Sequence, residues 1–88
     1  MNTSSPLSGI RLSLKTKDRD NVATMFDDKL ELTLIDEGVT VDKGIPFGHK
    51  VAVVCIAKGE AIRKYGVVIG HAKVDIRIGE HVHVHNIE

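Results

Sequence analysis

The chain has 88 residues, a length typical of one domain, and its 12 acidic and 12 basic residues leave no net charge. Because no basic field is present to attract phosphates, we expect no nucleic-acid partner. No apolar run approaches the ~20 residues that span a membrane, so we expect no membrane partner either. The single cysteine, Cys55, cannot form an internal disulfide, and the N-terminus lacks the pattern of an export signal. These features predict a cytoplasmic protein.

Residues 1–9 are small and polar and contain Pro6, a composition that predicts a disordered tail. A single domain is predicted over residues 10–88. Alternation of apolar and polar residues starts at Ile10 and indicates half-buried strands. The predicted strands cover residues 10–15, 22–26, 30–35, 39–41, 50–56, 60–64, 67–72, 74–78 and 81–87.

The segment 50–56 is apolar on both faces, so we expect it at the centre of the fold, with Cys55 as a buried, inert thiol. No window shows a helical period with caps, and most of the eight glycines lie between predicted strands, where they favour tight turns. The sequence therefore predicts an all-β fold, a compact, barrel-like set of short strands.

A short repeat links two of the predicted turns. Residues 56–60 (IAKGE) match residues 76–80 (IRIGE) twenty positions later. Each copy shows the end of a strand, a glycine that tolerates positive φ, and a glutamate that opens the next strand. On the residues alone, a general likeness between hairpin turns is the commoner explanation.

The strongest chemical signal is the alternation of histidine and valine over residues 81–86 (HVHVHN). On a strand, His81, His83 and His85 would share one face, and imidazoles two positions apart could converge on one ion or one anionic substrate. Neutral imidazole suits zinc, iron and nickel. A solvated strand face with spare histidines is the commoner outcome of such spacing.

Two further candidates lie in loops. His49 and Lys50 follow a loop that contains Pro46 and Gly48, and they could act on a substrate from beside the central strand. Lys64 and the neighbouring Tyr65 could bind a carboxylate and a hydroxyl group. In both cases an ordinary turn with charged residues is the commoner reading of the residues.

Five segments in order resemble the SAF domain of the altronate/galactarate dehydratase family, from about Asp20 to the C-terminus. These segments are residues 20–23 (DNVA), 45–52 (IPFGHKVA), 56–60 (IAKGE), 64–70 (KYGVVIG) and 79–86 (GEHVHVHN). The chain departs from the family pattern at Thr24-Met25-Phe26, where smaller aliphatic residues are expected, and at His71, where arginine is expected.

The resemblance implies a β-clip fold and a lyase that removes water from a hydroxy acid with a divalent metal, iron in the first place. It also implies a small subunit that is inactive alone and shares its active site with a separate large dehydratase subunit. Homo-oligomers are also compatible with the short β domain.

Carried onto this sequence, the resemblance implies catalytic roles for His49, His83 and His85, with His83 and His85 as metal ligands. It implies substrate binding for the residues Lys50, Lys64, Tyr65 and Asn86. Two alternatives stay open: the small subunit of a sulfolactate sulfo-lyase, which expels sulfite in place of water, and a stand-alone sugar-acid-binding module without catalysis.

Overall fold

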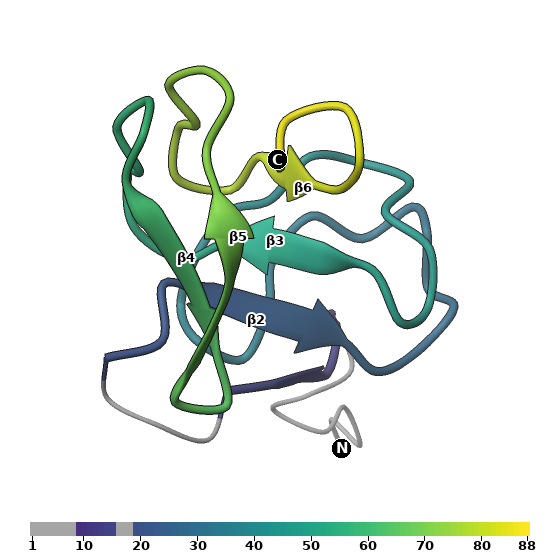
Figure 1. Cartoon of the computed structure of the whole chain (residues 1–88). Helices are drawn as coiled ribbons and strands as arrows, with labels where there is room; N and C mark the ends of the chain where they lie inside the picture. Colours follow the sequence, from purple (N-terminus) through teal and green to yellow (C-terminus); the bar gives the residue numbers. More distant parts are fainter. Residues whose placement is uncertain (1–8, 16–18) are drawn as a thin grey trace, which may run out of the picture.

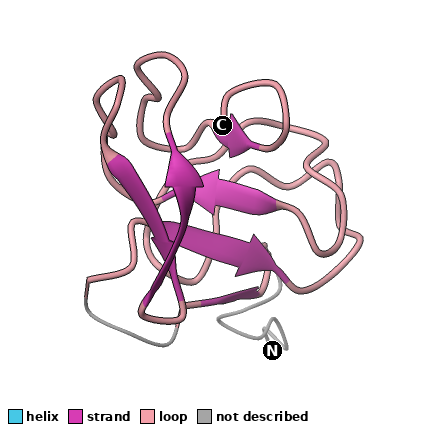
Figure 2. Cartoon of the chain, in the orientation of Figure 1, coloured by secondary structure: helices cyan, strands magenta, loops and turns pink. Residues whose placement is uncertain are grey.

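The computed structural model describes residues 9–15 and 19–88, and all regular structure within them is β-strand (Figures 1 and 2). This confirms the predicted all-β class. The strands are β1 (Ser13–Leu14), β2 (Val22–Met25), β3 (Lys50–Ala52), β4 (Ala61–Lys64), β5 (Val67–His71) and β6 (His81–Val82). Residues 1–8, which make up most of the predicted tail, lie outside the described residues. No helix that could cross a membrane occurs in the described part of the chain.

The larger sheet is antiparallel and has the strand order β1-β2-β3-β6. β2 pairs with β3 through Val22 and Ala52, and β6 joins the other edge of β3 by pairing His81 with Val51. Because the four residues of β2 are all buried, this strand and β3 lie at the centre of the fold. The sheet thereby places the start of β3 next to β6, although thirty residues separate them in the sequence.

The smaller sheet is the hairpin of β4 and β5, which crosses the larger sheet in Figure 1. Its two-residue turn, Tyr65-Gly66, has φ values of 55° and 78°, which match the twist of a tight hairpin. The carboxylate of Asp20 accepts hydrogen bonds of 2.8 Å from both turn N–H groups. The side chain of Asn21 bonds two backbone groups of β4, each at 2.8 Å. These two residues fix the hairpin against the start of β2.

Residues 50–62 and 70–82 are two copies of one structural unit. The end of each copy pairs with the beginning of the other, as β4 with β5 and β6 with β3. At the centre, Ile56 and Ile76 bridge each other with backbone hydrogen bonds of 2.8 and 2.7 Å. The short repeat in the sequence is therefore the trace of an internal two-fold relation, and not a general likeness of turns.

The turns of the two copies share their stereochemistry. Gly59 and Gly79 have φ values of 85° and 86°. Glu60 and Glu80 each accept a hydrogen bond from the backbone N–H three residues earlier, at 2.9 and 3.0 Å. The glutamate in the repeated motif thus closes its own turn.

Two buried clusters form the core. The first cluster consists of Val22 and three pairs that the repeat relates by twenty positions, Ala52 and Ala72, Ile56 and Ile76, and Ile62 and Val82. The second cluster contains Ala23, Met25, Ile35, Val41, Ile45, Val51 and Val53. Opposite faces of β2 and β3 contribute to the two clusters, since Val22 and Ala52 belong to the first and Ala23 and Val51 to the second.

Several predicted strands are shorter than expected or absent. Residues 30–35, 39–41 and 74–78 contribute isolated bridges only, because loops insert their apolar side chains into the core without a ladder. The central strand ends at Ala52, where the chain bends, so Val54 is 47% exposed. The prediction of a buried Cys55 is wrong for the same reason, since this thiol is exposed.

Candidate metal centre

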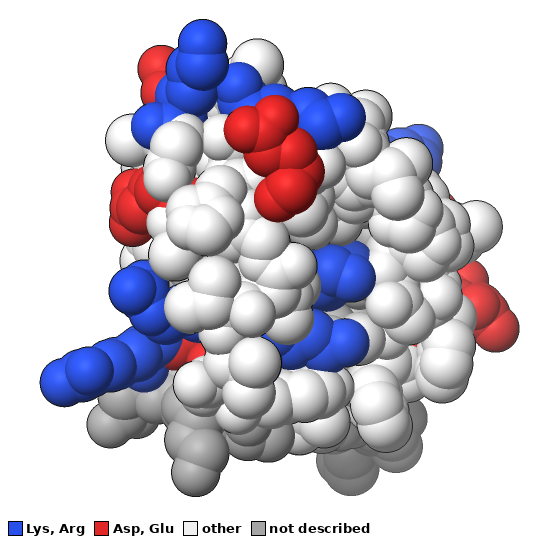
Figure 3. Space-filling view, viewed as in Figure 1, with Lys and Arg blue, Asp and Glu red and all other residues white. Residues whose placement is uncertain are grey.

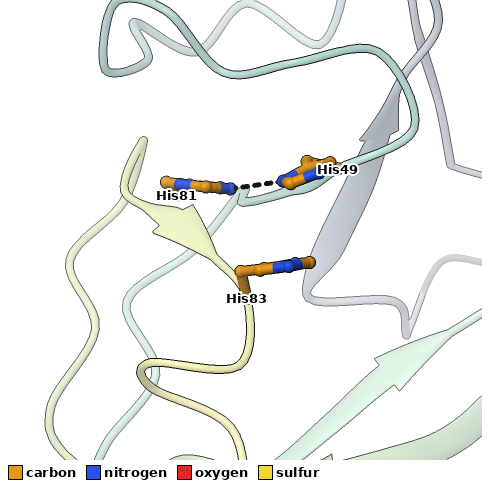
Figure 4. Close-up of side chains that lie close together, drawn as sticks. All are labelled: His49, His81 and His83. Carbon is orange, nitrogen blue, oxygen red and sulfur yellow. Dashed lines mark hydrogen bonds between the residues drawn. The ribbon is translucent and has the colours of Figure 1, made fainter.

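Three histidines from two distant segments meet where β3 and β6 adjoin (Figure 4). His49 directly precedes β3 and follows a turn in which Gly48 has a φ of 83°. The backbone carbonyl of His49 accepts a 2.8 Å hydrogen bond from Met25, and its N–H donates to Pro46. The sequence Pro-Phe-Gly-His therefore folds into a turn that β2 holds in place.

His81 lies in β6, and His83 follows immediately after the strand. The chain then turns, and Asn86 holds this turn from inside. The buried amide of Asn86 accepts a 2.9 Å hydrogen bond from the N–H of His83 and donates one of 2.9 Å to the carbonyl of His81. Asn86 thus fixes the backbone on which both imidazoles are mounted.

The three imidazole rings are close enough to act together. Nδ1 of His49 and Nε2 of His81 are 2.9 Å apart, and one donor atom from each of the three residues lies within 4.8 Å of the others. The ring centroids of His49 and His83 are 4.2 Å apart, in a stacked arrangement. We call His49, His81 and His83 the histidine triad.

Burial and neighbouring positive charge lower the pKa of two members of the triad, His81 and His83. Partial burial lowers the pKa of His81, and the other histidines lower it further. Desolvation likewise lowers the pKa of His83, with contributions from His49 and Lys50. Metal ions bind neutral imidazole, so a lowered pKa keeps the ligands available near neutral pH.

The donor set of the triad fits a first-row divalent metal. Imidazole nitrogen is a good ligand for iron, zinc and nickel, with zinc–nitrogen bonds of about 2.0–2.1 Å. Within the described residues, no other group of three metal-ligating side chains is this close. Three protein ligands leave positions open for a substrate or for a residue of another chain.

Of the two predicted metal ligands, His83 belongs to the triad and His85 does not. β6 ends at Val82, so His85 lies in the following turn and is exposed, with its ring centroid 5.4 Å from that of His81. His81 takes its place as a potential ligand. The alternation in the sequence already placed His81 on the same face as His83. This alternation was the signal that could have identified His81 as a potential ligand.

The remaining predicted site residues lie on both sheets and in the turn after β6. Lys50, the first residue of β3, is half-buried beside His49. Lys64 ends β4, and its ammonium nitrogen lies 4.9 Å from the ring centroid of Tyr65. The amide of Asn86 is engaged on both sides within its turn, so the structure gives it a positioning role. A cleft between the two copies of the repeat, lined by Cys55 among others, contains none of the triad.

Comparison with known proteins finds dehydratases and sulfo-lyase subunits. The family model described as "Altronate/galactarate dehydratase SAF domain" matches residues 11–88. Altronate dehydratase of Escherichia coli is 44% identical over 70 residues, which are 76% of this chain and 14% of the relative. The (2R)-sulfolactate sulfo-lyase subunit alpha of Chromohalobacter salexigens is 50% identical over 48 residues, which are 54% of this chain and 51% of the relative.

A second such alpha subunit, from Paracoccus pantotrophus, is 41% identical over 51 residues, covering 58% of this chain and 76% of the relative. The chain thus spans about a seventh of the first relative and about half of the Chromohalobacter subunit. The relatives are dehydratases and sulfo-lyases, and the term subunit alpha implies a multi-subunit enzyme. With the family model covering nearly all of the sequence, the resemblance is confirmed: this chain belongs to the altronate/galactarate dehydratase SAF domain family.

Proposed function

We propose that this chain is the small subunit of a metal-dependent hydroxy-acid lyase, and that its histidine triad holds a divalent metal, in the first place Fe²⁺, in an active site completed by a larger chain. The convergence of His49, His81 and His83 within 4.8 Å carries the proposal. The limited share of the dehydratase relatives that this chain matches supports the need for a larger partner.

The proposed reaction is the elimination of water from a sugar acid of the altronate or galactarate type. A bound divalent metal would supply Lewis acidity, which stabilises the charge that develops next to a carboxylate. Lys50 and Lys64 would bind anionic groups of the substrate, and Tyr65 would bind a hydroxyl group. His85, next to the triad and outside it, would exchange a proton with the substrate or with water.

A metal titration of the purified chain tests the triad directly. We expect Co²⁺, a spectroscopic substitute for Fe²⁺, to bind with one equivalent, and each of H49A, H81A and H83A to weaken its affinity at least about 100-fold, more than the loss of a supporting residue costs. The matched control is H71A, because His71 is an exposed histidine of β5 outside the triad. Absence of binding in the unaltered chain, or an equal loss in H71A, would contradict the proposal.

Activity is to be measured after co-expression with a large dehydratase subunit, using altronate, galactarate and sulfolactate. We expect turnover only in the complex, and loss of turnover in the triad variants. Turnover of sulfolactate alone would favour a sulfo-lyase, a candidate supported by the likeness to two alpha subunits. Ligand binding without any partner or turnover would favour the stand-alone module.

A further inference from the structure

We infer that the outer edge of β5 binds an extended segment of the larger chain as an added strand, so that the hairpin of β4 and β5 anchors this chain to its partner. The inference rests on the proposed function, which requires the larger chain, and it names the surface where that chain attaches. It is carried by the apolar, unpaired edge of β5, by the strand pairing that Glu88 makes on this edge, and by a clash that a second copy of the chain would meet there.

The outer edge of β5 is open and apolar. One edge of the strand pairs with β4, and within residues 9–15 and 19–88 no strand or bridge pairs with the other edge at Val67, Val68 or Ile69. These three residues are between 39% and 60% exposed. Figure 3 shows an uncharged surface over the middle of β5. The strand also lacks proline, lysine and acidic residues, which usually keep an exposed edge from pairing.

The same edge already accepts a strand at its far end. Ile87 bridges Ala72 in antiparallel orientation, and His71 and Glu88 exchange two backbone hydrogen bonds of 2.9 Å. A Cβ at Gly70 would lie 2.6 Å from Cγ2 of Ile87, so the glycine lets the two segments approach each other. The backbone of β5 is therefore shaped for an outer strand, and the unpaired part of its edge continues the same ladder.

A second copy of this chain does not fit this edge. A symmetric antiparallel pair centred on Val68 would place Tyr65 of one copy opposite His71 of the other. The position opposite His71 is already held by Glu88. Both copies would meet this clash, so the dimer would have to break the hydrogen bonds that Glu88 makes. A segment of another chain can pair with residues 67–69 and end before Glu88.

A large chain suits the hairpin better than a short peptide does. Neighbouring side chains of a strand point to opposite faces, so exposed residues in a row leave both faces of β5 open as well as its edge. A lone added strand would cover the edge, whereas a large chain can cover the faces too. The matched part of this chain spans only 14% of the Escherichia coli altronate dehydratase and 10% of the Bacillus subtilis one, which leaves ample further chain in such enzymes.

The test compares two lysine substitutions in complexes with a co-expressed large dehydratase subunit. We expect V68K to weaken the complex at least about tenfold, measured by its dissociation on dilution, because the new ammonium group would be buried without a partner. The matched control is V74K, since Val74 lies in a turn outside the hairpin and is 50% exposed, against 49% for Val68. As a second measurement, the amides of residues 67–69 should exchange hydrogen at least about tenfold more slowly in the unaltered complex than in the isolated chain.

Co²⁺ binding is measured on the same complexes, so that the two proposals fail separately. Absence of Co²⁺ binding in a complex that V68K weakens and V74K does not would count against the proposed function and leave this inference standing. An unchanged complex in V68K, equal weakening by both variants, or unchanged exchange at residues 67–69 would overturn the inference, while the Co²⁺ titration could still support the proposed function. Self-association of the isolated chain that V68K abolishes, or the lack of any complex with the large subunit, would overturn it as well.

Discussion

At the scale of single residues, the site depends on side chains that never reach a ligand. Asn86 uses both ends of its amide on the backbone between His81 and His83, so it sets the spacing of two imidazoles. The side chains of Asp20 and Asn21 also bond backbone groups, and they hold the hairpin that carries Lys64 in place. Supporting residues of this kind orient ligands and tune metal affinity without binding the metal themselves.

We predict that N86A lowers the Co²⁺ affinity of the chain by about 10–100-fold, the usual cost of losing a supporting residue. N86D keeps an acceptor for the N–H of His83 but loses the donor to the carbonyl of His81, so its affinity should fall between those of N86A and the unaltered chain. Calorimetric titration checks both variants. A loss of folding stability with unchanged metal affinity would contradict a positioning role.

Of the four residues that form and support the centre, the sequence indicated His49, His83 and Asn86 as site residues, and it did not select His81. Strand alternation correctly placed His81 and His83 on one face. It could not show that β6 ends at Val82, because this end depends on the buried amide of Asn86 and not on local propensity. The place of His49 beside them results from pairing between β3 and β6, which no local pattern encodes.

At the scale of elements, alternation of apolar residues was a poor guide to the predicted half-buried strand 10–15, where Leu12 and Leu14 are exposed and Arg11 is fully buried. It was a better guide in the segments that follow. Ile35, Val41 and Ile76 are buried as the pattern predicts, but each belongs to a loop with a single bridge or none. A small core filled by aliphatic side chains accepts insertions from loops as readily as from ladders. The class of the fold could therefore be predicted, whereas strand lengths and order could not.

The two copies of the repeated turn offer a matched pair of glycine substitutions. A Cβ at Gly79 would lie 2.0 Å from the carbonyl oxygen of Thr40, whereas a Cβ at Gly59 has nothing within 4 Å. Both glycines have positive φ, so alanine costs about 1–2 kcal/mol of conformational strain in each case.

We predict that G59A lowers the free energy of unfolding by about 1–2 kcal/mol. G79A should lower it by clearly more, because the backbone carbonyl of Thr40 cannot give way as a flexible side chain can. Urea denaturation of the two variants measures the difference. Equal losses would show that Thr40 and its loop move freely, against the packing described here.

At the scale of the whole molecule, the triad makes stability depend on pH. His81 and His83 have lowered pKa values in the folded chain, so the unfolded chain binds more protons below about pH 6.5. The free energy of unfolding therefore decreases as the pH falls through 6.5 and continues to decrease until the lowered pKa values are passed.

We predict that the double variant H81Q/H83Q shows a weaker loss of stability between about pH 7 and 5 than the unaltered chain, since its glutamines do not titrate. Urea denaturation at a series of pH values measures the slope, and H71Q, outside the triad, serves as the control. A slope that the double variant leaves unchanged would mean that other groups cause the acid sensitivity.

The internal two-fold relation has a consequence for how this centre could arise. The twenty-residue offset superimposes His81 on Ala61 and His83 on Arg63, while the buried Val82 corresponds to the buried Ile62. The two copies of the unit thus share the buried residue at this position, and only the second copy carries imidazoles on both sides of it. The variant A61H/R63H would test whether histidines at the matching positions of the first copy can also bind a metal ion.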